Sequence, residues 1–391
     1  MIKPGLIPRN NWDYTIADLC KALWGIIKPV QDPVKIFKEI FHNEPIFTTS
    51  GRTSLYAILK SLNLPSGATI GVPLYCCPVV FNALKQANLT PLFIDINSDD
   101  YNISITDLAE KKGSLSALIV VHMFGYPADM DSITSIVKGI PVIEDCAHSL
   151  FSKYKNQYTG TLSTASFFSF RSGKYLSSGE GSVIFCKDPL LHRKIATMVK
   201  TMNHWLPGKM IMHCIATYIK SLLYKRPWYG IVGYPIGRKL DSKFNLSAKT
   251  GFNINKIAGS DFRIIHNRIS TFQKNIEKQR ENSVFLKQRI KCKNVSFPKE
   301  KDENFSNCYL FPVKFENTKH RDAMADHLFK YNIDTAKYLD EVTNLVQKEY
   351  GYIGGCPQAE HCSKTVLLIP HFYTLSTKDL DHIAHCFNEL T

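Results

Sequence analysis

Short apolar runs alternate with helical patterns through the first half of the chain, and this alternation is the strongest constraint on its fold. The sequence predicts strands at ATIGVP (68–73), PLFIDI (91–96), SALIVVHMF (116–124), IPVIED (140–145) and GSVIFC (181–186). Several of these runs are apolar throughout, as in strands covered on both faces of a parallel sheet. Between them, SLYAILKSLNL (54–64) has the apolar spacing of a helix. The pattern predicts a doubly wound α/β domain over roughly residues 45–200.

The second half of the chain changes character. Residues 205–250 are rich in Trp, Tyr, Met and Lys, 259–291 have the pattern of one long polar helix, and 293–391 mix short strands with helices. We therefore expect a smaller C-terminal α+β domain. The predicted division is an N-terminal segment (1–44) packing on the small domain, a large domain (45–204), a basic aromatic insertion (205–250) and the small domain (251–391).

The composition is that of a packed globular protein. The chain has 391 residues, of which 44% are hydrophobic and 12% aromatic. The first residues, MIKPGLIPRNNWDYT, have no apolar core of a signal peptide, and no apolar stretch approaches the roughly 20 residues that span a bilayer. The eleven cysteines form no CxxC pairs, which favours free thiols in a reducing compartment and predicts a cytoplasmic protein without a structural metal.

Positive charge is concentrated in one region. The formal net charge is +14, and no acidic residue lies between Asp188 and Asp241, a stretch with nine lysines and arginines. Such a run indicates either a solvated basic face or an anionic partner, such as a nucleotide diphosphate or an acidic membrane. No recognised nucleic-acid-binding module accompanies the charge, so we expect no nucleic-acid partner.

An amphipathic helix is predicted inside this basic region, at KMIMHCIATYIKSLLY (209–224). Ile211, Ile215, Tyr218, Ile219 and Leu222 share one face, and an aromatic basic stretch follows. Two interpretations stay open. One is a lid or dimer element whose cations meet a substrate diphosphate. The other is a peripheral contact of residues 205–240 with the inner face of a membrane.

Three features of the large domain point to one kind of chemistry. TSGRTSL (49–55) puts Gly51, Arg52 and Thr53 where a helix begins, and free N–H groups there suit a phosphate. Asp145 closes a buried strand at the edge where α/β sheets bind ligands. Lys174 follows a strand-like run and precedes a glycine-rich turn. A phosphate cradle, a strand-end carboxylate and a loop lysine together describe a pyridoxal phosphate site, although each has a commoner structural explanation.

These stretches also carry a family resemblance. The chain resembles the DegT/StrS (DegT/DnrJ/EryC/StrS) sugar aminotransferases, which are pyridoxal-phosphate-dependent enzymes of fold type I, the aspartate-aminotransferase-like fold. VIEDCAHSL (142–150) and SFRSGKYLSSGEG (169–181) are the specific signals. TSGRTSL, GVPLYCCPVV, VVHMFGYPADMD, GFNINK and CPQAE follow in the family's order. The resemblance implies a large, mostly parallel sheet and a smaller C-terminal domain.

The resemblance also implies residue roles. Lys174 matches the lysine that binds pyridoxal phosphate covalently, and Asp145 the carboxylate that keeps its ring nitrogen protonated. Further cofactor-binding positions are the phosphate turn Gly51, Arg52 and Thr53, the phosphate serine Ser169, and Ala147 and His148 at the ring. Asn253 matches an asparagine that reaches the phosphate from the neighbouring subunit, which implies a homodimer with a shared active site.

Three positions depart from the family pattern. The aromatic residue that stacks on the ring in many relatives is absent near Cys77, so Cys77 and the nearby Tyr75 are the candidates for this cofactor-binding position. The usual arginine two positions after Asn253 is Asn255, and the stretch before GFNINK is long. The last two departures concern the substrate more than the cofactor.

The expected activity is amino transfer, by family habit from glutamate, to a keto group of a nucleotide-linked deoxysugar. Related dehydratases carry histidine where this chain has Lys174, so the lysine favours transfer. The alternatives are a non-catalytic cofactor-binding paralogue with a regulatory or scaffolding role, and an aminotransferase acting on a non-sugar or membrane-associated carbonyl.

Overall fold

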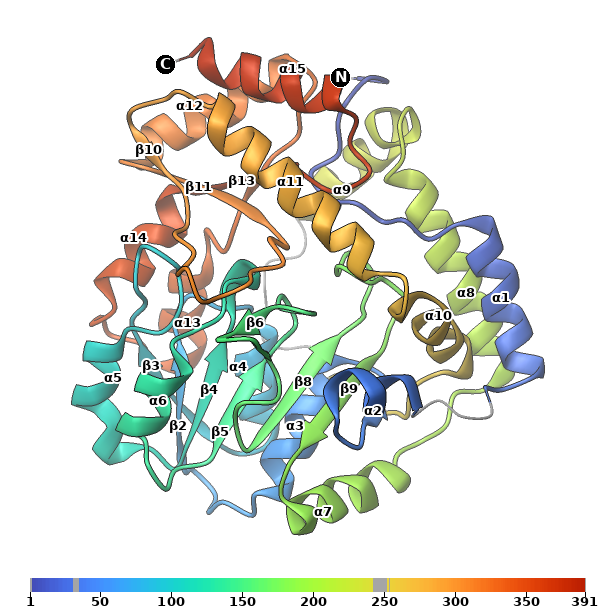
Figure 1. Cartoon of the computed structure of the whole chain (residues 1–391), viewed down its shortest axis with the longest axis vertical. Coiled ribbons are helices and arrows are strands. Elements are labelled where there is room, and N and C mark those ends of the chain that lie inside the picture. Colours follow the sequence, from blue (N-terminus) through green and yellow to red (C-terminus); the bar gives the residue numbers. More distant parts are fainter. Residues whose placement is uncertain (1, 31–34, 242–251, 253, 391) are drawn as a thin grey trace.

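A seven-stranded sheet forms the centre of the larger part of the molecule (Figure 1). The structure is a computed structural model that describes residues 2–30, 35–241, 252 and 254–390. In spatial order the strands are β1 (Ile46–Thr48), β9 (Ser182–Cys186), β8 (Ala165–Ser169), β5 (Val142–Asp145), β4 (Ala117–Val121), β2 (Thr69–Pro73) and β3 (Thr90–Ile94). All neighbours are parallel except for β9, which runs antiparallel to both β1 and β8. The mostly parallel sheet expected from the apolar runs is confirmed.

Helices cover both faces of this sheet. One face packs against α3 (Gly51–Ser61), α4 (Val79–Gln86) and α7 (Pro189–Lys200). The other packs against α5 (Ile105–Lys111) and α6 (Met130–Ile136) at one end, and against α2 (Lys35–Phe41) and α10 (Gly259–Ile269) at the other. The central strands β4 and β9 are buried along their whole length, which explains why their sequences show no alternation.

A smaller antiparallel sheet completes the C-terminal half. Its strands, in spatial order, are β10 (Val295–Ser296), β11 (Phe311–Phe315), β13 (Val366–Ile369) and β12 (Ala336–Lys337). Helices α11 (Gln273–Arg289), α12 (Thr318–Lys330) and α15 (Thr377–Asn388) share one core with it. Helices α13 (Val342–Tyr350) and α14 (Pro357–Thr365) pack into the core of the large sheet instead, so they join the two sheets.

The prediction of one long helix over 259–291 is wrong. The chain forms α10 and α11, separated at Ser270–Phe272. Phe272 is buried between Tyr175 and Tyr373, and this burial turns the chain between the two helices. Ile265 and Ile269 of α10 lie in the core of the large sheet together with Ile276 near the start of α11, whereas Leu286 near the end of α11 lies in the core of the small one.

The N-terminal segment runs across both parts. Ile7 forms a bridge with Ile333 and lies in the core of the small sheet. Helix α1 (Ile16–Ile27) then packs against α10 and α8 (Pro207–Leu223), at the right of Figure 1. The helix predicted over 209–224 is thus confirmed. The boundaries of the four predicted parts stay a prediction.

Candidate active site

Asp145 is the last residue of β5, at the carboxyl edge of the parallel strands. Its side chain is buried, and Oδ1 accepts a hydrogen bond from the Ala147 N–H at 3.0 Å. Burial raises the pKa of this carboxyl, while the Ala147 N–H and the Lys174 ammonium oppose the shift. A buried carboxylate with one backbone partner has capacity left for a cationic ligand group.

The start of α3 provides the second part of the site. Ser50 is the N-cap, and its hydroxyl accepts a hydrogen bond from the Thr53 N–H at 3.3 Å. Gly51 begins the helix against β8, where a Cβ atom would lie 3.3 Å from the Phe167 ring and 3.5 Å from Ser169 Cβ. The missing side chain leaves the first N–H groups of the helix accessible beside Ser169. This is the arrangement that binds phosphate.

Lys174 lies in the turn that follows β8. The turn is closed by the Lys174 N–H donating to the Arg171 carbonyl at 2.9 Å, and Gly173 takes a left-handed φ of 84°. The Lys174 Nζ lies 5.6 Å from the centre of the Tyr309 ring. Burial lowers the pKa of the amine to about 8, with a further lowering by the Arg171 guanidinium. The Lys174 side chain is half-buried.

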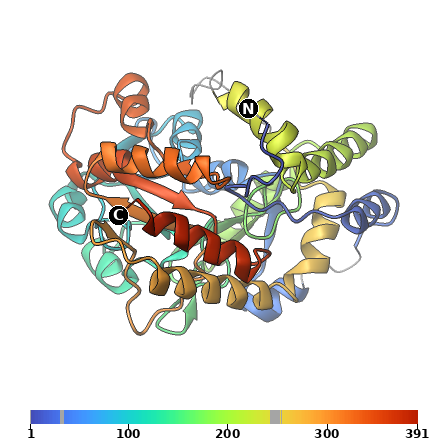
Figure 2. The same cartoon turned by 90° about the horizontal axis from the view of Figure 1, so that it is seen from above.

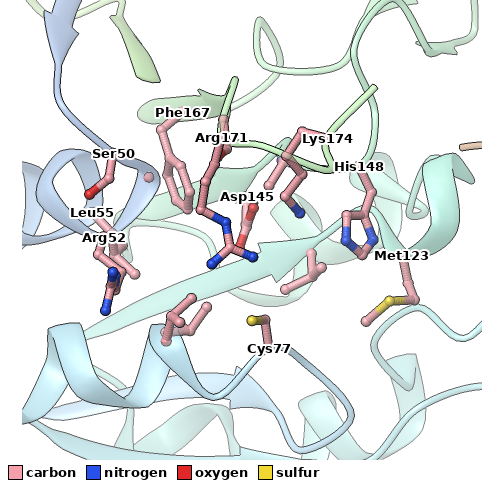
Figure 3. Close-up of a pocket in the computed structure, with 16 residues that line it drawn as sticks. Ser50, Arg52, Leu55, Cys77, Met123, Asp145, His148, Phe167, Arg171 and Lys174 are labelled. Carbon is pink, nitrogen blue, oxygen red and sulfur yellow. Dashed lines mark hydrogen bonds between the residues drawn. The ribbon is translucent and has the colours of Figure 1, made fainter. Parts of the chain in front are cut away.

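These three parts meet in one cavity. Figure 3 shows the side chains of Asp145, Arg171 and Lys174 converging on one space, with Arg52 at one end and His148 at the other. The other lining residues are Ser50, Gly51, Leu55, Cys77, Val79, Val80, Val121, Met123, Ala147, Phe167 and Ser169. The cavity therefore combines apolar walls with an anion-binding end, a carboxylate and a lysine.

Eight of the eleven predicted site residues line this cavity: Gly51, Arg52, Cys77, Asp145, Ala147, His148, Ser169 and Lys174. Thr53 does not, because its side chain is fully buried beside the Ser50 hydroxyl. Tyr75 does not either, and its expected place in the site is corrected. The Tyr75 ring is buried among Tyr101, Phe124 and Tyr338. Asn253 lies outside the described residues.

His148 is held as a neutral imidazole. It is buried, and its Nδ1 accepts a hydrogen bond from the Phe124 N–H at 3.3 Å. Burial lowers the pKa of His148 well below its usual value, and the neighbouring Lys174 lowers it further. Its ring lies 4.8 Å from that of Tyr309. An uncharged ring at this place keeps a second cation away from Lys174.

Among the polar residues at the site, sequence reasoning missed Ser50, Arg171 and Tyr309. Ser50 and Arg171 line the cavity and stand next to predicted residues. An inspection of the three positions before Lys174 would have singled out Arg171, since a cation there faces the same space. Tyr309 also contacts Lys174, but it comes from the small domain and no local pattern marks it.

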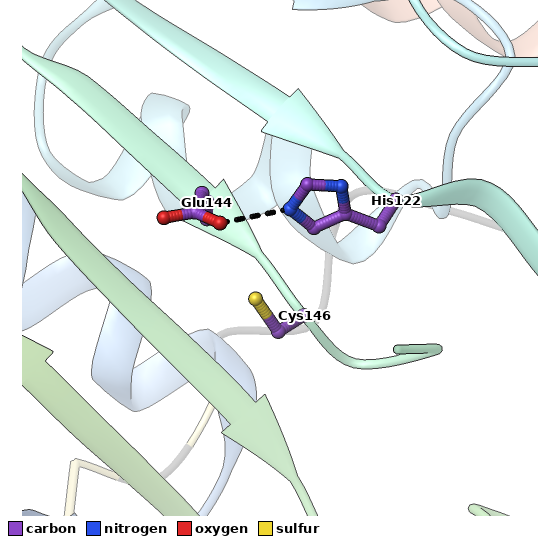
Figure 4. Close-up of side chains that lie close together, drawn as sticks. All are labelled: His122, Glu144 and Cys146. Carbon is purple, nitrogen blue, oxygen red and sulfur yellow. Dashed lines mark hydrogen bonds and ion pairs between the residues drawn. The ribbon is translucent and has the colours of Figure 1, made fainter. Parts of the chain in front are cut away.

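A buried group next to the site resembles a metal cluster but is structural. His122, Glu144 and Cys146 have ligand atoms within 4.8 Å of one another (Figure 4). However, the Glu144 carboxylate already accepts four hydrogen bonds, from His122 Nε2 at 3.0 Å, the Gly160 N–H at 2.7 Å, the Leu162 N–H at 2.9 Å and the Ser163 hydroxyl at 2.8 Å. With His122 Nδ1 accepting from the Ala128 N–H, neither His122 nor Glu144 has a lone pair left for an ion, and Cys146 alone would be a single ligand. The group fastens the loop of residues 160–163 to β5.

Comparisons with known proteins identify the class. A sequence profile of the DegT/DnrJ/EryC1/StrS aminotransferase family matches residues 37–388. A GDP-perosamine synthase from Escherichia coli O157:H7 is 26% identical over 90% of this chain and 87% of its own. A UDP-N-acetyl-3-dehydro-alpha-D-glucosamine 3-aminotransferase from Acidithiobacillus ferrooxidans is 31% identical over 37% of this chain and 41% of its own.

Solved structures agree on the fold. The aminotransferase TlmJ from Streptoalloteichus hindustanus superposes with a TM-score of 0.77 at 19% identity, covering 100% of this chain and 98% of that one. A GDP-4-keto-6-deoxy-D-mannose-3-dehydratase from E. coli superposes almost as well, with a TM-score of 0.76 at 18% identity, covering 99% of this chain and 100% of that one. The fold therefore serves both amino transfer and dehydration, and the site must distinguish them.

The fold and the cavity define a sugar aminotransferase of fold type I. The chain belongs to the DegT/DnrJ/EryC1/StrS aminotransferase family, as the profile match over most of its length shows.

Proposed function

We propose that this enzyme uses pyridoxal phosphate to transfer an amino group, supplied by glutamate, to the keto group of a nucleotide-linked deoxysugar. The meeting of Lys174, Asp145 and the start of α3 in one cavity is the observation that carries the proposal. The relatives support the substrate class, because two of them are named for GDP-linked and UDP-linked sugars.

The residues of the cavity fit pyridoxal phosphate. The phosphate would lie at the α3 N-terminus, with donors from Ser50, Gly51 and Ser169 and the charge of Arg52. Asp145 would pair with the protonated ring nitrogen, a cation that suits a buried carboxylate with few partners. The group, when bound, supplies an electron sink for negative charge on the carbon next to the transferred nitrogen.

The chain's own residues do the rest. Lys174 would hold the cofactor covalently and, once released, would move the proton at the reacting carbon. Its pKa of about 8 leaves part of the amine neutral near pH 7, which an exposed lysine would not achieve. Asp145 would hold the cofactor's ring nitrogen in its protonated form and so stabilise the charge that develops there. Buried His148 stays neutral and adds no competing cation.

A second cavity supports a polar substrate. Lys174 lines it too, together with Arg9, Asn10, Gln279 and Tyr309 among others. Amide, phenol and guanidinium groups can bind sugar hydroxyls and an anionic nucleotide. Arg9 and Arg171 therefore provide cations on the two sides of Lys174.

The shared active site of a homodimer belongs to the same proposal. Asn253, the residue expected to reach the partner's phosphate, lies outside the described residues. Its neighbours approach α3 within one chain: the Thr49 N–H donates to the Asn255 carbonyl at 3.1 Å, and the Arg52 guanidinium lies 5.5 Å from the Phe252 ring. Phe252 and Asn255 thus lie beside the anion-binding end of their own chain, and the homodimer rests on the family resemblance.

Lys174→Ala tests the proposal directly. The wild-type protein, incubated with pyridoxal phosphate and reduced with borohydride, should carry the cofactor mass on the peptide that contains Lys174. The variant should lose this label, the visible absorbance of the lysine-bound cofactor and all turnover, while its circular dichroism spectrum stays unchanged. Lys138→Ala, at an exposed position, is the matched control and should behave as wild type. A label retained in Lys174→Ala would place the nucleophile elsewhere.

The amino donor and acceptor need a separate measurement. Glutamate should convert the cofactor to its aminated form, which is visible by absorbance, and a panel of keto-sugar nucleotides should reverse the change. No response to glutamate or to any other amino donor would favour a non-catalytic cofactor-binding protein. A response to the donor with reversal only by non-sugar ketones would favour the non-sugar alternative.

A further inference from the structure

Helix α8 presents its apolar side to solvent. Ile211, Met212, Ile215 and Ile219 are exposed to 42%, 68%, 39% and 50%. They share one helical side, so they form a continuous stripe. Scattered exposed apolar residues are normal in proteins, but a contiguous stripe of large ones marks an interaction surface.

Polar contacts fix α8 in this orientation. Its buried side consists of Cys214, Thr217 and Ser221. The Ser221 hydroxyl donates to the Tyr14 carbonyl at 2.6 Å, and His213 Nε2 lies 3.0 Å from the buried Asp261 carboxylate. Since these partners are inside the protein, the helix cannot rotate its isoleucines inward without leaving them unpaired.

Helix α1 extends the stripe. The two helices lie side by side at one edge of the molecule (Figures 1 and 2). The α1 residues Leu19 and Leu23 pack with Tyr218 of α8. The solvent side of α1 then exposes Ile16, Trp24 and Ile27 to 57%, 54% and 77%. Both of these neighbouring helices therefore leave large apolar side chains in water.

The charges around the stripe have one sign. Lys209 and Lys220 lie at one side of the α8 stripe, and Lys21 and Lys28 are exposed on α1. None of these four forms an ion pair with a described carboxylate. The single acidic residue of the two helices, Asp18, is buried in the capping box of α1. A partner for this face must accept apolar side chains and supply negative charge.

We propose that the face formed by α1 and α8 docks on the surface of an anionic lipid bilayer. The isoleucines would enter the boundary of the acyl chains, Trp24 the headgroup level, and the lysines the plane of the lipid phosphates. The contact is peripheral, since none of the described helices is long and apolar enough to cross a bilayer. A second copy of the chain is a poorer partner, because its matching face carries the same lysines and supplies no negative charge.

Vesicle co-sedimentation of the full chain tests the proposal. The wild-type protein should sediment with vesicles of phosphatidylcholine and phosphatidylserine, less so with phosphatidylcholine alone, and less at high salt. The double variant Ile215→Ser/Ile219→Ser should lose at least ten-fold in apparent affinity, as expected when two apolar side chains no longer leave water. Lys209→Gln/Lys220→Gln should lose about 30-fold, at about five-fold per lysine, on acidic vesicles only.

Matched controls distinguish binding through the α1 and α8 face from non-specific binding by other exposed residues. Val284→Ser and Lys278→Gln change exposed residues on α11, on another part of the surface, and should leave binding unchanged. Circular dichroism and glutamate-dependent activity should be the same in all variants. If Ile215→Ser/Ile219→Ser fails to fold, Met212→Ser, at a more exposed position, replaces it. Absence of wild-type binding to acidic vesicles overturns the proposal. So does equal binding to neutral vesicles, or a dimer in sedimentation that the isoleucine variant dissociates.

Discussion

At the residue scale, burial sets the protonation of the two groups that carry the chemistry. Lys174 and Asp145 line one cavity, and their desolvation works in opposite directions, lowering the pKa of the amine and raising that of the carboxyl. The amine gains reactivity from this shift. Burial of the charged Asp145 carboxylate costs folding stability, and a cationic ring bound next to it would compensate this cost. The protein should therefore be less stable without the cofactor than with the cofactor bound.

Asp145→Asn tests this trade. Because the pKa of Asp145 in the folded protein is raised, its ionisation costs stability, a loss that grows as the pH rises from the ordinary pKa of aspartate through the folded value. In the cofactor-free protein at pH 7, the variant should therefore melt at a higher temperature than wild type. Its kcat should fall roughly 10²–10³-fold, the range for loss of one electrostatic contact in an enzyme site.

The control for this variant is Asp131→Asn. Asp131 is exposed and pairs with Lys155 at 2.7 Å. Thermal melting should shift little, and kcat should not change. A cofactor-free Asp145→Asn protein that is less stable than wild type would show that the carboxylate has a structural role instead.

At the element scale, the start of α3 combines capping with anion binding. Ser50 caps the helix and also lines the cavity, whereas Ser104 caps α5 with the same 3.3 Å hydrogen bond and lies outside it. Ser50→Ala and Ser104→Ala should each cost about 1 kcal/mol of unfolding free energy. Only Ser50→Ala should also weaken binding of pyridoxal phosphate, measured by fluorescence titration. Equal affinity in both variants would separate the cap from the phosphate site.

The end of β5 depends on the buried network of Glu144. Burial raises the pKa of this carboxyl, but the hydrogen bond from His122 and the other donors outweigh it, and the net pKa is lowered. The resulting stability is present above the ordinary pKa of glutamate and is lost as the pH falls through the folded value. Glu144→Gln replaces one carboxylate oxygen with an N–H₂ group, which faces N–H and O–H donors and cannot accept their hydrogen bonds. The variant should lose roughly 1–3 kcal/mol of unfolding free energy, measured by denaturant unfolding. Chelators should leave the wild-type stability unchanged; a metal-dependent loss would contradict the structural role.

At the scale of the whole molecule, ionic contacts hold distant parts of the chain around the site. Asp13, just before α1, accepts hydrogen bonds from Arg268 of α10 and Tyr373 near the small sheet. Both partners of the Asp13–Arg268 pair are mostly buried, at 17% and 16% exposure. The pair therefore ties the N-terminal segment to both halves of the molecule.

Breaking this pair should destabilise the protein strongly. Asp13→Asn leaves the Arg268 guanidinium without its counter-charge and should cost about 3–5 kcal/mol in denaturant unfolding. The control is Asp381→Asn, since Asp381 pairs with Arg289 at an exposed position and should cost at most about 1 kcal/mol. Similar losses in both variants would mean that the buried pair contributes no more than a surface one.

Much of the fold and most of the candidate site follow from local sequence. The buried strands are apolar over several consecutive residues, the α3 N-terminus has its own capping serine and glycine, and Asp145 and Lys174 stand directly after strands. The stretches 142–150 and 169–181 also bring the family pattern with them. These features can be predicted from the sequence because each depends on neighbours within a few residues.

Tertiary structure alone decided the rest, because those features depend on contacts between residues far apart in the chain. The Tyr75 side chain packs in an aromatic core that includes Tyr338. The burial of Phe272 interrupts the helix predicted over 259–291. The same holds for α8, whose amphipathic pattern left open what its isoleucine stripe faces. Ser221 and His213 hydrogen-bond to the buried Tyr14 carbonyl and Asp261 carboxylate, and this orientation leaves the apolar stripe on the surface. Local pattern determines which elements form, and the pairing of buried polar groups determines which side of an element faces water.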